Sequence, residues 1–238
     1  MTNSTSDTDA QRLNAQFFND NDRYLQSVSE LTTYRNIRDV LSTSLRGSRR
    51  LLDIGNGGVF DYPFDVADEI VGVDLFVGSE AAARLPDHVT LVQADARDLP
   101  TSMGRFDTVA MIMLIHHLVD RDPADQTQLI REMLIGLDKV MTDDARLVIV
   151  ESTVSQSFHR FESLVYPWMY RWLTRGAAGH PPVMQLSAIA LAELVTERFD
   201  ISAMRRIPVG GTLLQFGRRF PSALSPARPI LIEARPRR

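Results

Sequence analysis

Five short apolar runs occupy the first two-thirds of the chain, and their length and spacing constrain the fold more than any other feature. They cover residues 50–54, 69–75, 89–93, 106–115 and 146–151. Each run is apolar almost throughout, so both of its faces must be covered, as happens in parallel sheets. The connectors are long enough for crossovers, and residues 123–141 are amphipathic. The sequence therefore predicts an α/β fold with a doubly wound, mostly parallel sheet.

The segments around this core have other patterns. Residues 1–14 are polar and predict a disordered tail, whereas residues 15–47 have helical spacing and predict a helical cap. After the core, 48–152, we expect a helical lid over 153–185. A final helix with Ser187 as its N-cap, followed by closing antiparallel strands, would then fill 186–238. This organisation predicts a single domain over 15–238.

The predicted lid is rich in aromatic side chains. They can shape an apolar pocket or simply form helix core, and at helical spacing core is the expected role for most of them. The six side chains are Phe158, Phe161, Tyr166, Trp168, Tyr170 and Trp172.

Composition excludes several kinds of chemistry. The 238 residues contain no cysteine, which rules out disulfides, thiolate metal sites and a cysteine nucleophile. A net charge of -4 argues against a nucleic-acid partner. The amino terminus is polar, and no run of about eighteen apolar residues occurs, so we expect a cytoplasmic protein with no membrane partner. No metal-binding motif is present and none is predicted. No motif indicates an oligomeric state.

A glycine-rich turn follows the first apolar run. In LLDIGNGG, residues 51–58, the run passes through Asp53 and reaches three glycines within four positions. Glycine allows the backbone to approach a ligand without a Cβ clash. A tight turn alone is the alternative interpretation, because such a motif is weakly specific by itself.

Carboxylates also end the next two runs. Asp74 lies at the end of IVGVDLF and Asp95 at the end of VTLVQAD. In an open parallel sheet, ligands bind outside the carboxyl ends of the strands, where Asp53, Asp74 and Asp95 would all lie. A carboxylate about twenty residues after the glycines can accept hydrogen bonds from both hydroxyls of a ribose, so the spacing favours a nucleoside.

With these motifs the sequence resembles the class I S-adenosylmethionine-dependent methyltransferases, which have a Rossmann-like fold. The resemblance covers about residues 48–152 and rests on LLDIGNGG, VGVDLF, QADARDLP and FDTVAMIMLIHHL. It implies S-adenosyl-L-methionine as the cofactor. It also implies that the glycine loop contacts the methionine part of this cofactor and that the end of the second strand binds its ribose. The end of the third strand would bind the adenine, and the backbone at the end of the fourth would face the amino group. The implied cofactor-binding residues are Asp53, Gly55, Asn56, Gly57, Asp74, Leu75, Asp95, Ala96 and Ile112.

The turn after the first run departs from the family pattern, and one other family remains to be compared. Val59 stands where the family usually has a further glycine, and Pro63 follows closely, so the first crossover helix must be short or distorted. A nicotinamide-binding Rossmann protein is the competing interpretation. Its G-x-G-x-x-G spacing is not met, because Phe60 occupies the last position.

Candidate catalytic residues follow the fourth and fifth runs. His117 is the first candidate for a general base and His116 the second, since an imidazole titrates near neutral pH. Both could instead serve structure, one packed under the sheet edge and the other bonded to a loop carbonyl or lining the cofactor. Glu151 could meet an acceptor amine or pair with an arginine of the lid. Methyl transfer is an in-line displacement, so a base is needed only where the acceptor must lose a proton.

The predicted activity is methylation of a nitrogen or oxygen of a small molecule. The fourth run ends in IMLIHHL and lacks the Asp/Asn-Pro-Pro-aromatic clamp of enzymes that methylate a flipped base. By analogy with the family, we expect a role in bacterial natural-product biosynthesis. The alternatives are methylation of a peptide terminus and a catalytically inactive cofactor-binding partner or sensor, which the absent glycine at Val59 favours.

Overall fold

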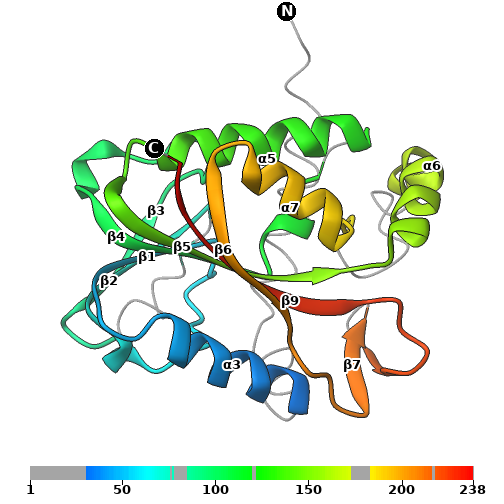
Figure 1. The fold of residues 1–238 in the computed structure, drawn as a ribbon, viewed down its shortest axis with the longest axis horizontal. Helices are drawn as coiled ribbons and strands as arrows, with labels where there is room; N and C mark the ends of the chain where they lie inside the picture. Colours follow the sequence, from blue (N-terminus) through cyan, green and yellow to red (C-terminus); the bar gives the residue numbers. More distant parts are fainter. Residues whose placement is uncertain are drawn as a thin grey trace, which may run out of the picture.

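The main body of the protein is a seven-stranded sheet with helices on both faces (Figure 1). The computed structural model describes residues 31–75, 77, 85–119, 122–172, 183–215 and 218–237. The predicted tail, residues 15–30 of the predicted cap and residues 173–182 of the predicted lid lie outside them. The strand order is β3-β2-β1-β4-β5-β9-β6. The first five strands in this order pair in parallel, which confirms the predicted doubly wound α/β fold.

The five predicted runs form the parallel part of the sheet. They are β1 (Ser48–Ile54), β2 (Ala67–Asp74), β3 (Val89–Gln93), β4 (Phe106–Ile112) and β5 (Met141–Thr153). The fourth strand ends three residues before the predicted end of its run, because Ile115–His117 form a 3-10 turn, η3. Both candidate histidines therefore lie in this turn after β4.

Apolar side chains of the strands are buried on both faces of the sheet. On one face Leu52 and Ile54 pack with helices α5 (Pro123–Leu137) and α7 (Ala188–Thr196). On the other face Leu51 packs with helix α3 (Thr32–Ser44). Figure 1 shows α5 and α7 on one side of the sheet and α3 on the opposite side. This two-sided coverage explains why the strands read as continuous apolar runs.

The first crossover, between β1 and β2, contains only the 3-10 turn η1 (Phe64–Val66), with Pro63 as its N-cap. Proline fixes its own φ and disfavours helix at the residue before it, so a helix cannot run through this position. The prediction of a short or distorted first crossover is confirmed. A second 3-10 turn, η2 (Thr101–Met103), precedes β4.

The carboxyl-terminal part closes the sheet with antiparallel pairing. β9 (Arg228–Pro236) lies between β5 and β6 (Phe199–Arg206) and is antiparallel to both. β7 (Thr212–Gln215) and β8 (Arg218–Pro221) form a separate two-stranded hairpin. Ser187 caps α7 by accepting a hydrogen bond from the Ala190 amide, as its position predicts.

The aromatic segment of the predicted lid forms helix α6 (Gln156–Trp172), at the end of the molecule toward which β5 runs (Figure 1). Tyr166 and Tyr170 are buried, but Phe158, Phe161 and Trp168 are exposed. The expectation that most of these aromatics form core is therefore wrong for the described side chains. α6 contacts α5 and α7, and helical spacing alone could not show which of its aromatic side chains these helices cover. None of the described helices is long and apolar enough to span a membrane.

Candidate active site

The candidate site lies where the strand order reverses, at the carboxyl ends of β1 and β4. The chain leaves β1 toward β2 on one side, and β4 pairs with β1 on the other. Crossovers on the two sides run in opposite directions, which opens a crevice outside these strand ends. The glycine loop, residues 55–58, follows β1, and the turn that carries both histidines follows β4.

Glycine is required at position 55 by both backbone and packing. Gly55 has φ +78°, and a Cβ atom there would lie 2.4 Å from the side chain of Leu114. Met113, which precedes Leu114, has φ 52° although it is not glycine. Such a conformation costs about 1–3 kcal/mol and persists only where the surroundings enforce it. The tight turn after β4 is thereby pressed against the glycine loop, which brings the two loops together at one site.

Asp53 is a buried carboxylate at the base of this site. Its Oδ2 accepts a hydrogen bond from the Tyr62 hydroxyl (2.8 Å) and a longer one from the Asn56 amide (3.4 Å). Its Oδ1 is buried and has no hydrogen-bond partner. Burial raises the pKa of Asp53 to about 7, although the hydrogen bonds from Tyr62 and Asn56 oppose this rise. A buried acceptor oxygen without a partner is uncommon in folded proteins, so Oδ1 is suited to a ligand cation.

Asn56 and Asp74 hold the glycine loop in place. Asn56 accepts from the Gly58 amide (2.9 Å), and its side chain lies over β2 where Gly72 leaves room, since a Cβ on Gly72 would lie 2.5 Å from Asn56 Nδ2. Asp74, the last residue of β2, accepts a hydrogen bond from the Gly57 amide (2.8 Å). The loop and the second strand end therefore form one unit.

Asp95 follows β3 and is bound by a neighbouring arginine. Arg97 donates to both carboxylate oxygens, the shortest contact being 2.6 Å, and its amide donates to Oδ1 (2.9 Å). Burial acts to raise the pKa of Asp95, but the hydrogen bonds and charge of Arg97 outweigh it and hold the pKa below its usual value. Arg97 therefore competes with any ligand group for this carboxylate.

These residues fit S-adenosyl-L-methionine. Its ammonium, ribose hydroxyls and adenine amino group are three separated donors, and the three carboxylates Asp53, Asp74 and Asp95 lie at three neighbouring strand ends. The remaining cofactor candidates adjoin them: Leu75 follows Asp74, Ala96 follows Asp95, and Ile112 is the last residue of β4. The fold thus brings together all the residues that the sequence assigned to the cofactor.

A histidine and a glutamate meet on the β4 and β5 side of the crevice. Nδ1 of His116 lies 2.6 Å from Oε1 of Glu151, and this carboxylate is buried. Glu151 also accepts from the Ile115 amide (2.7 Å) and the Ser152 amide (2.6 Å). A carboxylate that receives backbone donors on both oxygens acts as an acceptor, so Nδ1 of His116 donates the proton. Nε2 is then the ring nitrogen that can accept a proton.

Of the three catalytic candidates predicted from the sequence, two form this pair and the third lies beside it. His116 contacts Glu151 directly, whereas the ring of His117 lies beside that of His116, with 4.2 Å between the ring centroids. Glu151 pairs with a histidine rather than with an arginine of the lid. The geometry therefore favours His116 as the base, ahead of His117.

Sequence reasoning missed several residues of this neighbourhood. Tyr62 donates a hydrogen bond to Asp53, and Arg97 donates hydrogen bonds to Asp95. Gln185 donates a hydrogen bond to Ser152 Oγ (2.7 Å), next to Glu151. Tyr62 lies nine positions after Asp53 in an irregular crossover. Gln185 lies 33 positions after Ser152. No periodicity or known motif marks either residue, so only the folded chain shows them.

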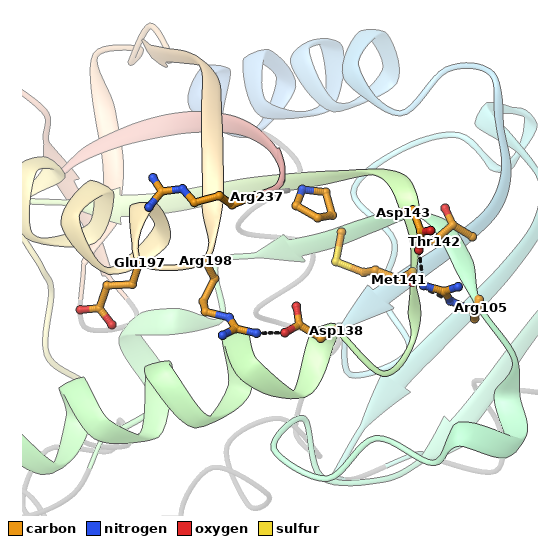
Figure 2. A pocket seen from close by; sticks show the side chains of 9 residues that line it. Arg105, Asp138, Met141, Thr142, Asp143, Glu197, Arg198 and Arg237 are labelled. Carbon is orange, nitrogen blue, oxygen red and sulfur yellow. Dashed lines mark hydrogen bonds and ion pairs between the residues drawn. The ribbon is translucent and has the colours of Figure 1, made fainter.

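A hollow of about 370 Å³ lies at the opposite ends of β4 and β5 (Figure 2). It is lined mainly by charged side chains, and four of these form two pairs: Arg105 with Asp143 (2.9 Å) and Arg198 with Asp138. The hollow is remote from the strand ends that carry Asp53 and Glu151, and we do not assign it to the site. No group of three or more potential metal ligands occurs in the described parts of the chain.

The fold and the site define a class I methyltransferase architecture, and the comparisons agree. Residues 52–137, from β1 through α5, match the model of the methyltransferase domain family. The sheet order and the antiparallel β9 complete the fold of the class I S-adenosylmethionine-dependent methyltransferases, whose cofactor is S-adenosyl-L-methionine. No curated protein matches the chain in sequence.

Solved structures share this fold at low sequence identity. The N-methyltransferase NodS from Bradyrhizobium japonicum WM9, in complex with S-adenosyl-L-homocysteine, is 14% identical; the match covers 97% of this chain and 99% of NodS, with a TM-score of 0.60. The 1,6-didemethyltoxoflavin-N1-methyltransferase of Burkholderia thailandensis is 16% identical over 96% and 87% of the two chains (TM-score 0.59). The geranyl diphosphate C-methyltransferase of Streptomyces coelicolor A3(2) is 12% identical over 84% and 80% (TM-score 0.54). At these identities the likeness concerns the fold.

Proposed function

We propose that the protein binds S-adenosyl-L-methionine at the ends of β1, β2 and β3 and transfers the methyl group to a nitrogen or oxygen of a small molecule. The observation that carries this proposal is the arrangement of the strand ends. Three carboxylates and a glycine loop occupy one side of the crevice, and the His116–Glu151 pair occupies the other. Cofactor and acceptor would thus meet between adjacent strands.

The residues of the site divide the work of the reaction. When bound, the cofactor supplies a methyl group on a sulfonium, which is displaced in line. Asp53 binds the cofactor ammonium, Asp74 the ribose and Asp95 the adenine, with the backbone at Ile112 near the ammonium. His116 takes the acceptor proton at Nε2, and Glu151 holds the imidazole orientation and stabilises the imidazolium that forms. The Leu114 side chain packs against Gly55 where these two parts meet.

Calorimetric titration tests the cofactor part of this proposal. We expect S-adenosyl-L-methionine and S-adenosyl-L-homocysteine to bind with micromolar dissociation constants, which correspond to about -8 kcal/mol. NAD should not bind, because the glycine spacing does not suit a dinucleotide. Binding of NAD in place of the other two would overturn the proposal and leave only the fold.

The affinity for S-adenosyl-L-homocysteine is expected to depend on the ionisation of Asp53. The pKa of this carboxyl is raised to about 7 in the free protein, and only the ionised form pairs with the ligand ammonium. Affinity should therefore rise about 10-fold between about pH 6 and pH 8, as the ionised fraction rises. Asp53→Asn keeps an oxygen for the Tyr62 hydroxyl but removes the charge, so its binding should be weaker and independent of pH.

Thermal unfolding provides the control for this pH effect. A carboxyl whose pKa is raised on folding contributes stability below its unfolded pKa and loses it as pH rises through the folded pKa. Above about pH 7, Asp53→Asn should therefore be more stable than the wild type, by about 1–4 kcal/mol. A variant with the same pH-dependent binding as the wild type would show that Asp53 does not meet the ammonium.

The names of two structural neighbours support a small-molecule acceptor. The toxoflavin-type enzyme is seen with 1,6-didemethyltoxoflavin, and another structural neighbour is a pyocyanin biosynthetic protein. These names support a role in bacterial natural-product biosynthesis for this chain. An inactive cofactor-binding partner is the second candidate, and the absent glycine at Val59 favours it. It predicts tight cofactor binding without turnover over a broad acceptor panel.

A further inference from the structure

Helix α6 turns polar groups inward and apolar groups outward. Phe161, Leu164 and Trp168 are 60%, 80% and 75% exposed. At helical spacing on the opposite face lie His159, Glu162 and Tyr166, and Tyr166 is fully buried. A helix that only covers a core normally buries its apolar face. The inward face of α6 therefore combines the buried rings of Tyr166 and Tyr170 with two polar side chains, His159 and Glu162.

A short segment after α6, Met184–Gln185, connects this polar face to the His116–Glu151 pair. The Met184 amide donates to the carbonyl oxygen of His116 (3.1 Å). The side chain of Gln185 donates to Ser152 Oγ (2.7 Å), next to Glu151. On the α6 side, Nδ1 of His159 donates to the carbonyl oxygen of Gln185 (3.1 Å), and the Gln185 amide donates to the Glu162 carboxylate. Glu162 is therefore linked to the His116–Glu151 pair through the Met184–Gln185 segment.

One oxygen of Glu162 is left without a partner. Oε2 is buried and accepts no hydrogen bond, and Glu162 forms no ion pair with the described residues. Burial raises the pKa of Glu162 to about 7, although the hydrogen bond from the Gln185 amide opposes the rise. A second buried oxygen without a partner, Oε1 of Gln126, belongs to a side chain whose amide donates to the Met184 carbonyl (2.9 Å). Two acceptor oxygens attached to the same segment thus lack donors.

We propose that Glu162 recognises the methyl acceptor and that the acceptor carries an amine whose N–H groups bind Oε2. A cationic amine supplies both the missing hydrogen bond and the missing counter-charge, whereas a hydroxyl supplies only the hydrogen bond. This inference rests on the proposed methyltransferase function and adds the chemical class of its substrate. Glu162 positions the substrate, and His116 removes a proton from the ammonium so that the neutral nitrogen can attack the methyl group and displace S-adenosyl-L-homocysteine.

The test is a turnover screen with pairs of an amine and an alcohol that share a carbon skeleton, such as benzylamine and benzyl alcohol. Turnover is measured as the release of S-adenosyl-L-homocysteine. The variants are Glu162→Gln, which keeps the shape and removes the charge, and Glu193→Gln, an exposed glutamate on α7. We expect the wild type to methylate amines, and Glu162→Gln to raise KM for them roughly 10- to 100-fold with a smaller change in kcat. Glu193→Gln should match the wild type.

Calorimetric titration of each variant with S-adenosyl-L-homocysteine separates the possible failures. Affinity within about twofold of the wild type shows that Glu162→Gln is folded and that its cofactor site is intact. Turnover of alcohols alone, undiminished amine turnover by Glu162→Gln, or no amine turnover by a wild type that binds the cofactor product would each overturn the role of Glu162. Absence of cofactor binding in every variant, the wild type included, would instead overturn the proposed function.

Discussion

Replacing His116 by asparagine is expected to lower kcat by about 10²- to 10⁴-fold, the usual contribution of a general base. The proposed amine acceptor must lose a proton before it is methylated, and His116 is the group that Glu151 would orient for this task (2.6 Å between Nδ1 and Oε1). The asparagine amide can still donate to Glu151, so the buried carboxylate is not left without a partner. The measurement is single-turnover methyl transfer to an acceptor from the amine screen, with cofactor affinity determined in parallel.

Two further histidines make this prediction specific. His88→Asn changes an exposed histidine whose Nε2 lies 3.2 Å from the Phe64 carbonyl oxygen, and it should leave turnover unchanged. His117→Asn should lower kcat far less than His116→Asn, because His117 lies beside the pair and does not hold the Glu151 contact. A larger loss in His117→Asn would restore His117 as the base. Full turnover in His116→Asn would mean that the acceptor nitrogen is already deprotonated when it binds.

Replacing Asp74 by alanine is expected to weaken S-adenosyl-L-homocysteine binding by about 5- to 150-fold, equivalent to roughly 1–3 kcal/mol. Two effects add in this variant. The ribose hydroxyls lose a charged acceptor, and the Gly57 amide loses the hydrogen bond that joins the glycine loop to β2 (2.8 Å). Calorimetric titration at a fixed pH of about 8, where Asp53 is largely ionised, measures the change.

Asp68→Ala is the matched control for this variant. Asp68 lies near the start of the same strand, at the end remote from the glycine loop, and its side chain is exposed. Its replacement should leave affinity unchanged. If Asp74→Ala also bound the cofactor product normally, the ribose would have to be held elsewhere, and the assignment of the second strand end would be wrong.

The cofactor half of the site was largely predictable from the sequence because its residues follow strands. A carboxylate at the end of an apolar run must lie at the carboxyl edge of a parallel sheet, so Asp53, Asp74 and Asp95 could be placed together before the fold was seen. The glycine loop follows a strand in the same way, so its place was also predictable. The hydrogen bonds from Arg97 to Asp95 were not predictable, because they depend on how the loop after β3 turns back on itself.

The acceptor half was less predictable because its contacts join segments far apart in the chain. His116 and Glu151 are 35 positions apart, and their pairing requires the 3-10 turn after β4 to face the end of β5. The sequence placed both candidates correctly at strand ends but ranked His117 ahead of His116. Nothing in the letters HH indicates which ring turns toward the carboxylate.

The amino-acid sequence by itself determined the layered α/β fold, the strand ends that carry the site and the kind of cofactor they suit. These features follow from local periodicity and from the geometry of parallel strands, which every such chain must obey. Only the tertiary structure decided the partners of the buried polar groups: Tyr62 on Asp53, His116 on Glu151 and Gln185 beside Glu162. A buried carboxylate takes its partner from whichever segment packs against it, and that choice depends on the whole fold rather than on neighbouring residues.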